Sequence, residues 1–302
     1  MAGVAPREDR LTLGLAAMAI GVVFFTCIDT SAKWLMLAGV APLQVVFARY
    51  AGHLFTAIVL FLPSEGLGVF RSARPGVQAA RSLALALSTL FNFMALATLP
   101  ITVTTTIMFA GPIVVTLLAI PMLGEVVGVH RIAAVFVGFV GVLVVMQPWG
   151  AEFDPAMLLV LCALLSSSLY FILTRKLAGI ERNSTSQVWS SAVPVFVLGP
   201  YVLPIWTWPD RPLDIGVMAA IGLFGAFGHI LVTWAHRLAD ASILAPVIYI
   251  QIVLAAFAGI VVFGAWPTTS TLAGGLIIVA AGLYIWHRER LRGRPPARTG
   301  PV

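Results

Sequence analysis

The sequence predicts an all-α integral membrane protein with ten transmembrane helices, arranged as two inverted repeats of five helices. Three observations support this fold class: the composition, the succession of long apolar segments, and the sidedness of the basic residues. Hydrophobic residues make up 60% of the 302 positions and charged residues only 10%, whereas soluble domains average about 25% charged residues. A soluble fold of this length could not bury so much apolar surface, so the bilayer must solvate most of it.

Ten apolar segments follow one another along the chain, separated by short breaks of Pro, Gly and charged residues. A spanning helix needs about 20 consecutive apolar residues, and these segments are apolar on every face, which favours helices over an alternating β-barrel. The predicted spans are 11–37, 42–62, 76–98, 102–122, 130–147, 155–174, 185–206, 213–235, 242–264 and 269–286.

The basic residues outside the spans gather on one side of the predicted topology. With the N-terminus in the cytoplasm, the outer side holds at most Lys33, near the end of the first span, and Arg211, while Arg49 and Arg81 lie inside spans. This distribution follows the positive-inside rule. The inner side holds Arg7, Arg10, Arg71, Arg74, Arg131, Arg175, Lys176, Arg182, Arg237 and the Arg residues of the tail. We therefore expect a multi-pass protein of the cell (inner) membrane with both termini cytoplasmic. The net charge of +6 is explained by this topology, so no nucleic-acid partner is expected.

A weak internal repeat divides the spans into two groups of five. An odd number of spans per group makes the two groups insert with opposite orientation, as in many secondary transporters. We expect repeat 1 over 11–147, repeat 2 over 155–286 and a basic disordered cytoplasmic tail over 287–302. The aligned positions are Thr102 with Ser242, Thr105 with Ala245, Gly124 with Gly264 and Gly141 with Gly282.

The chain resembles the EamA-type branch of the drug/metabolite transporter superfamily over about 11–286. The resemblance is carried by Lys33, Arg49, Pro112 and the pair Gly124-Glu125, while the second half departs from the pattern at Ala265 and Ile252. It implies a transporter of small metabolites, closest in character to bacterial amino-acid and metabolite exporters. Riboflavin or a nucleoside-like compound is the alternative cargo.

Polar residues inside spans are candidate functional residues, because hydrocarbon penalises them. Asp29 and Arg49 lie at similar depths on neighbouring spans, which predicts that they pair, with Lys33 sharing the carboxylate. Such a pair is either a gate, a site for a zwitterionic or anionic substrate, or a structural ion pair. The other candidates for the cavity lining are His53, Asn92, Phe109, Tyr170, Tyr249 and Gln251.

Proline residues in the fourth and ninth spans are candidate hinges. Pro112 and Pro246 each remove a backbone donor and kink a helix, so each is either a hinge or a simple kink. Lys33 is a candidate gating residue near the outer mouth. Glycine-rich stretches in the fifth and tenth spans indicate close helix packing, and a homodimer contact, if one forms, is expected there.

A secondary transporter explains these features better than a membrane enzyme or a channel. The sequence has no Walker-type glycine loop, no HExxH motif and no paired-Cys metal site, so neither a cofactor nor a metal is expected. A lipid-modifying enzyme remains the alternative, but it needs several acids or His residues at one depth. The expected partners are a small-molecule substrate and the lipid bilayer, and the expected mechanism is alternating access between the two halves.

Overall fold

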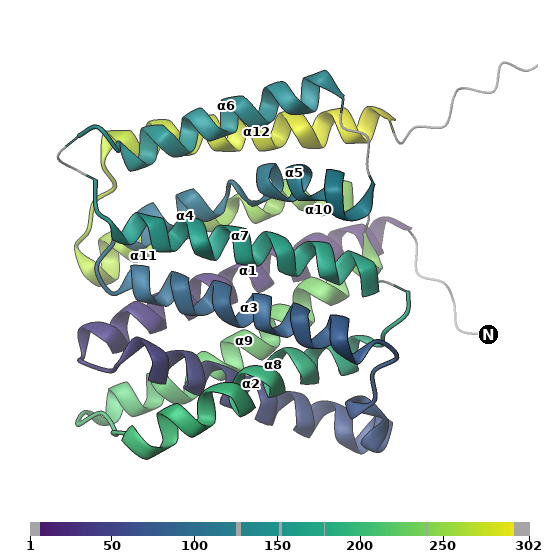
Figure 1. Ribbon diagram of the computed structural model, residues 1–302, viewed down its shortest axis with the longest axis vertical. Helices are drawn as coiled ribbons and strands as arrows, with labels where there is room; N and C mark the ends of the chain where they lie inside the picture. The colour runs from purple at the N-terminus through teal and green to yellow at the C-terminus, as the bar shows by residue number, and fades with distance from the viewer. Residues whose placement is uncertain (1–6, 125–127, 151–152, 178, 240, 293–302) are drawn as a thin grey trace, which may run out of the picture.

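The computed structural model describes residues 7–124, 128–150, 153–177, 179–239 and 241–292, and within these ranges it contains helices and no strands (Figure 1). The first half contains α1 (Arg7–Leu37), α2 (Pro42–Glu65), η1 (Gly66–Phe70), α3 (Pro75–Leu96), α4 (Ile101–Met108), α5 (Gly111–Leu123) and α6 (Val129–Met146). The second half contains α7 (Ala156–Leu177), α8 (Asn183–Val202), η2 (Leu203–Ile205), α9 (Pro212–Leu238), α10 (Ala241–Ile248), α11 (Ile250–Phe263) and α12 (Thr269–Arg292). The predicted all-α membrane fold is confirmed.

The helices match the predicted spans closely. Among the described residues, nine helical segments are long and apolar enough to cross a bilayer, and a shorter apolar helix, Ile132–Met146, corresponds to the fifth predicted span. The start of α1 and the end of α12 lie at the same end of the bundle (Figure 1), as an even number of crossings requires. Which end faces the cytoplasm stays a prediction.

Two of the predicted spans are broken helices. The fourth is divided between α4 and α5 at Phe109 and Ala110, and Pro112 then occupies the first turn of α5, where its missing N–H costs no helical hydrogen bond. The ninth is divided between α10 and α11 at Tyr249, shortly after Pro246. The breaks thus fall at corresponding places in the two halves.

Glycine ends both broken helices in the same way. Gly124 after α5 has φ 70° and Gly264 after α11 has φ 64°, the left-handed conformation that glycine adopts at a helix C-terminus without a steric cost. These two glycines are the pair that the sequence repeat aligns.

Helices of one half pack against helices of the other half, and the pairs are equivalent when the two halves are interchanged. Helix α1 packs along α9 as α3 packs along α7, while α6 pairs with α12 and α4 with α11. In Figure 1, α6 and α12 form one side-by-side pair at an edge of the bundle, α2, α8 and α9 fill the opposite part, and α1 and α3 lie between them. Two inverted halves would pack in this way, although the repeat boundaries themselves stay a prediction.

Helices α2 and α9 approach each other through glycine. A Cβ built on Gly52 would lie 2.9 Å from the Cα of Gly222, and one built on Gly222 would lie 2.5 Å from the Cα of Gly52. Small residues at such crossings let two membrane helices pack backbone to backbone. This contact brings the polar face of α2 against α9.

The outer edge of the α6–α12 pair is apolar. Phe136, Phe139 and Leu276 are exposed there, as expected for a surface in contact with lipid or with a second copy. The homodimer through these spans stays a prediction. Helix α12 continues to Arg292, past residue 287 where a disordered tail was predicted, and residues 293–302 lie outside the described ranges.

Candidate substrate site between α1, α2, α3 and α9

Arg49 and His53 are the centre of a polar face on α2. The helix begins with Pro42 in its first turn, and residues four apart lie on one face of a helix. Both side chains are buried, Arg49 with 6% of its surface exposed and His53 with 2%. A cation at this burial needs compensating groups, because desolvation of a full charge costs several kcal/mol.

Neutral groups surround the guanidinium of Arg49. Its Nη1 donates to the Thr89 hydroxyl of α3 over 2.8 Å, and the ring of Tyr50 lies 4.8 Å from the guanidinium carbon. The Tyr50 hydroxyl bonds to the same Thr89 oxygen over 2.8 Å. These contacts hold the side chain in place without neutralising its charge.

The predicted ion pair between Asp29 and Arg49 is not formed. Asp29 instead accepts a hydrogen bond of 3.2 Å from the amide of Asn92 on α3, and the ion pairs between described side chains do not include one with Arg49. The two residues remain within Coulombic range of each other. Each of the two side chains instead bonds to α3, Asp29 to Asn92 and Arg49 to Thr89.

Lys33 does not share the Asp29 carboxylate either. Its ammonium donates to the carbonyl oxygens of Leu96 at 2.9 Å and Leu99 at 2.7 Å. The last carbonyls of a helix have no partner within the helix, and the negative end of its dipole attracts a cation. Lys33 therefore caps the C-terminal end of α3. Comparing the positions of Asp29, Lys33 and Arg49 along their helices could not reveal these carbonyl acceptors.

His229 joins the site from α9. Its ring stacks on His53 at 5.7 Å between centroids and 18° between planes, and Phe25 of α1 packs against it at 5.1 Å. Asp29, Asn92 and His229 are half-buried. The site thus combines an acid with its amide partner, a cation, two imidazoles and aromatic walls, contributed by helices from both halves of the chain.

The remaining predicted residues form two other groups. Phe109 and Tyr249, which flank the two helix breaks, face each other with ring centroids 5.3 Å apart. Gln251 is half-buried in the first turn of α11, Pro112 is exposed and Pro246 is half-buried. The hinge role of the two prolines stays a prediction.

Tyr170 is held by Arg81, which lies inside the third predicted span and was not among the predicted functional residues. Arg81 is buried on α3 and donates from Nη2 to the Tyr170 hydroxyl at 2.9 Å, from Nε to Thr174 at 2.7 Å and from Nη1 to Ser190 at 2.8 Å. Its acceptors come from α7 and α8, so this residue joins the two halves. The signal that could have found it is the cost of an arginine inside a span, which demands buried acceptors nearby.

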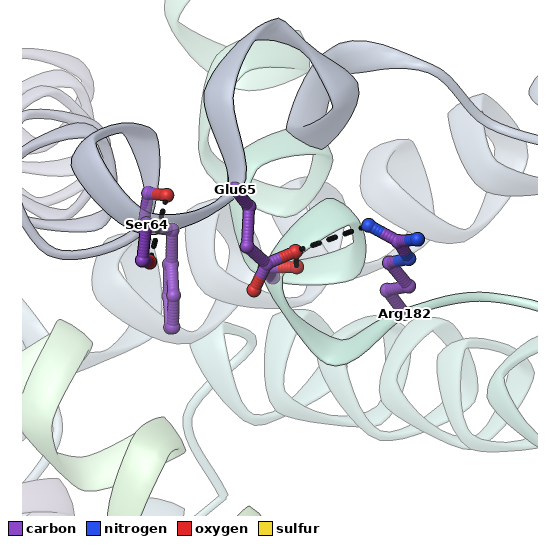
Figure 2. A network of polar contacts seen from close by, with 5 residues as sticks. Ser64, Glu65 and Arg182 are labelled. Carbon is purple, nitrogen blue, oxygen red and sulfur yellow. Dashed lines mark hydrogen bonds and ion pairs between the residues drawn. The ribbon is translucent and has the colours of Figure 1, made fainter.

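The halves are also joined at the end of the bundle where α2 leads into α3 and α7 into α8. The carboxylate of Glu65 accepts a 2.6 Å hydrogen bond from Ser184 and forms a 3.7 Å ion pair with Arg182 (Figure 2). Glu181 accepts from the Ser72 hydroxyl and from the backbone N–H of Arg74. A cavity of about 460 Å³ lies at this end, lined by Phe61, Glu65, Glu181, Arg182, Asn183 and Ser184.

The bond between Glu65 and Ser184 is the stronger contact of this cluster. Arg182 has 72% of its side chain exposed, and exposed ion pairs contribute about 0–1 kcal/mol. Ser184 is buried with 3% exposed, and a hydroxyl bonded to a carboxylate at this distance is charge-assisted. The carboxylate of Glu65, at the end of α2, contacts the first turn of α8 through Ser184. The helix dipole favours an anion at this end of α8.

The opposite end of the bundle is also joined by polar contacts. Trp34 of α1 donates from its indole to Asp214 of α9 over 2.8 Å, and Gln44 of α2 donates to the Thr207 carbonyl. Glu125, one of the residues on which the family resemblance was based, lies outside the described residues.

The model of the EamA-like transporter family matches residues 154–286. The chain is 28% identical to the S-adenosylmethionine uptake transporter of Rickettsia prowazekii, with 82% of this chain and 83% of that protein covered. It is 28% identical to the riboflavin transporter of Rhizobium johnstonii, with 97% of each covered, and 25% identical to the pseudopaline exporter CntI of Pseudomonas aeruginosa, with 82% and 87% covered.

A solved crystal structure shares the fold. Its TM-score is 0.64 at 17% sequence identity, with 94% of this chain and 100% of that chain covered. The family and these relatives are transporters rather than enzymes. The chain is therefore a multi-pass membrane protein whose residues 154–286 match the EamA-like transporter family.

Proposed function

We propose that this protein moves an amino-acid-type metabolite across the bacterial inner membrane by alternating access, with the site between α1, α2, α3 and α9 as its binding site. The observation that carries the proposal is the separation of Asp29 from Arg49. An acid and a cation that lie within Coulombic range without pairing suit the ammonium and carboxylate groups of a zwitterion.

The aromatic residues of the site favour a substrate with a ring. Phe25 and the stacked pair of His53 and His229 form flat surfaces beside the charged groups, and aromatic walls with few polar groups are typical of small-molecule sites. S-adenosylmethionine, the cargo in the name of one relative, joins an amino-acid group to a ring system. It is therefore the first compound to test, followed by L-phenylalanine.

Counterflow into proteoliposomes tests this function. Liposomes containing the purified protein and unlabelled S-adenosylmethionine, L-phenylalanine or riboflavin are given the same compound in radiolabelled form. We expect transient accumulation of at least one of the two amino-acid compounds and none in protein-free liposomes. Accumulation of riboflavin alone would contradict an amino-acid substrate, and conversion of lipid without solute movement would contradict transport altogether.

We further propose export as the physiological direction. A secondary transporter moves its substrate down the combined gradient, and the relatives include proteins named for uptake and for export. Expression in bacterial cells loaded with a dipeptide of the transported amino acid should speed the appearance of that amino acid outside. If the cells instead take up the amino acid faster while its release is unchanged, the physiological direction is uptake and not export.

The Glu65 and Ser184 contact is proposed as part of the gate at the predicted cytoplasmic end. This contact joins the end of α2 to the start of α8, so the end can open only when it breaks. In a chain with Cys27 and Cys162 replaced by alanine, we expect a short reducible cross-link between Glu65→Cys and Ser184→Cys to lower flux at least about tenfold, since a covalent bridge removes the open state. Flux measured before cross-linking, after it and after reduction checks this.

A cross-link within one half is the matched control for the gate. Ser64 is at the end of α2 and Gly68 is in η1, so both belong to the first half. A cross-link between Ser64→Cys and Gly68→Cys does not bridge the halves and should leave flux unchanged. Normal flux through the Glu65–Ser184 cross-linked protein would show that this end does not move during transport.

A further inference from the structure

Two buried nitrogen atoms on the polar face of α2 have no hydrogen-bond partner among the described residues. They are Nε of Arg49 and Nε2 of His53. A buried donor without a partner costs about 1–3 kcal/mol, and more when the group is charged. Both atoms belong to side chains that are more than nine-tenths buried, so bulk water does not compensate them. A ligand group that accepts hydrogen bonds would.

Helix α9 carries a glycine beside these two side chains. A Cβ built on Gly225 would lie 3.9 Å from Nε of Arg49 and 3.8 Å from Nδ1 of His53. At this point α9 therefore presents only backbone to both side chains. Arg49 and His53 therefore lie against the backbone of α9 at Gly225, where a methyl group would make only ordinary van der Waals contacts.

The other charged and polar groups around these two side chains do not neutralise Arg49. Asp29 is bonded to Asn92, Thr89 is a neutral acceptor for Nη1, and His229 stacks on His53. The neutral amide of Gln187, buried on α8, also lies beside the His53 ring. Arg81, another buried arginine, is engaged by Tyr170, Thr174 and Ser190. Arg49 therefore keeps an unpaired positive charge and an unsatisfied donor, which complement one negative charge on the ligand.

We propose that Arg49 and His53 bind the carboxylate of the transported metabolite, with Nε of Arg49 and Nε2 of His53 as donors. This inference rests on the proposed function and names the group that the site recognises. A carboxylate carries one charge and accepts several hydrogen bonds, which matches one guanidinium and one imidazole. A phosphate group would bring nearly two charges into a buried site that supplies one.

The consequence is a requirement for the carboxylate that transport assays can measure. We compare L-phenylalanine with 2-phenylethylamine, and S-adenosylmethionine with its decarboxylated form, each as a competitor of counterflow by the purified protein. Removing one partner of a buried charged contact lowers affinity steeply, so we expect the carboxylate compound to compete about 100-fold better than its amine counterpart.

Two variants separate binding from folding. Arg49→Gln should reduce the preference for the carboxylate compound to a few fold or less, because the charge is gone. Gly225→Ala makes only ordinary van der Waals contacts and so should fold, but its methyl group occupies the space beside Nε and should weaken competition by the carboxylate compound about tenfold. Arg71→Gln, an exposed arginine outside the site, is the control that keeps the wild-type preference.

The outcomes are distinguishable. A preference for the carboxylate in the wild type that both variants reduce supports the inference. Equal competition by acid and amine, or a preference that Arg49→Gln and Gly225→Ala both leave intact, overturns it while the proposed function stands. Failure of every compound to move overturns the proposed function and this inference with it.

Discussion

Gly222→Ala is expected to prevent α2 and α9 from packing and to leave little folded protein in the membrane. The added Cβ would lie 2.5 Å from the Cα and 2.8 Å from the carbonyl carbon of Gly52, and 3.0 Å from the backbone nitrogen of His53. These are backbone atoms, so no side-chain rotation relieves the clash and the helices must move apart. Overpacking of this kind costs on the order of 3 kcal/mol. Thermal unfolding of the detergent-purified protein measures the loss.

The matched control lies on the same helix. Gly216 has no atom within 4 Å of the position of its Cβ, so Gly216→Ala should leave the unfolding temperature unchanged or raise it slightly, since alanine is favoured over glycine inside a helix by about 1 kcal/mol. If Gly222→Ala proves as stable as Gly216→Ala, the direct contact between the two glycines is wrong. Because Gly52 precedes His53, the same substitution should also displace the polar face of α2.

Arg81→Leu is expected to separate the two halves at the start of α3. The substitution removes hydrogen bonds to Thr174, Ser190 and the Tyr170 hydroxyl, and the buried phenol then lacks its donor. Hydrogen bonds to charged groups contribute about 1.5–3 kcal/mol each, and the gain from placing an apolar side chain in this site offsets only part of that loss. We expect a stability loss of about 3 kcal/mol, measured by thermal unfolding in detergent.

Arg81→Lys distinguishes geometry from charge. Lysine keeps the positive charge but cannot present the planar fork of the guanidinium to three acceptors, so it should recover less than half of the stability lost in Arg81→Leu. Arg71→Leu, at an exposed position before the same helix, should have no effect. Wild-type stability of Arg81→Leu would mean that this network does not hold the halves together.

The positions of the spans could be predicted because the bilayer imposes a constraint on every segment separately. Each span must be long and apolar enough to cross hydrocarbon, and each break needs Pro, Gly or charge. Pro112 and Pro246 lie close to the two helix breaks, and Gly124 and Gly264, which the repeat aligns, follow the ends of α5 and α11. The extension of α12 to Arg292 was missed because a charged helix beyond the bilayer has no apolar signal.

The partners of the polar residues could not be predicted in the same way. Depth along a helix follows from sequence, but the direction of a side chain around the helix axis depends on which helices are neighbours. Asp29 and Arg49 were placed at one depth, yet Asp29 meets Asn92 and Arg49 meets Thr89. Lys33 reaches backbone carbonyls of α3, acceptors that every residue carries and that no sequence pattern distinguishes.

The sequence by itself determined the all-helical membrane fold, the span positions and the list of polar residues that hydrocarbon makes costly. Only the tertiary structure decided that α9 crosses α2 at Gly222, and this contact brings Gly225 and His229 beside Arg49 and His53. The reason is physical. The need for an apolar segment acts on each helix separately, whereas a polar site inside a bundle depends on which helices, distant in the sequence, pack against one another.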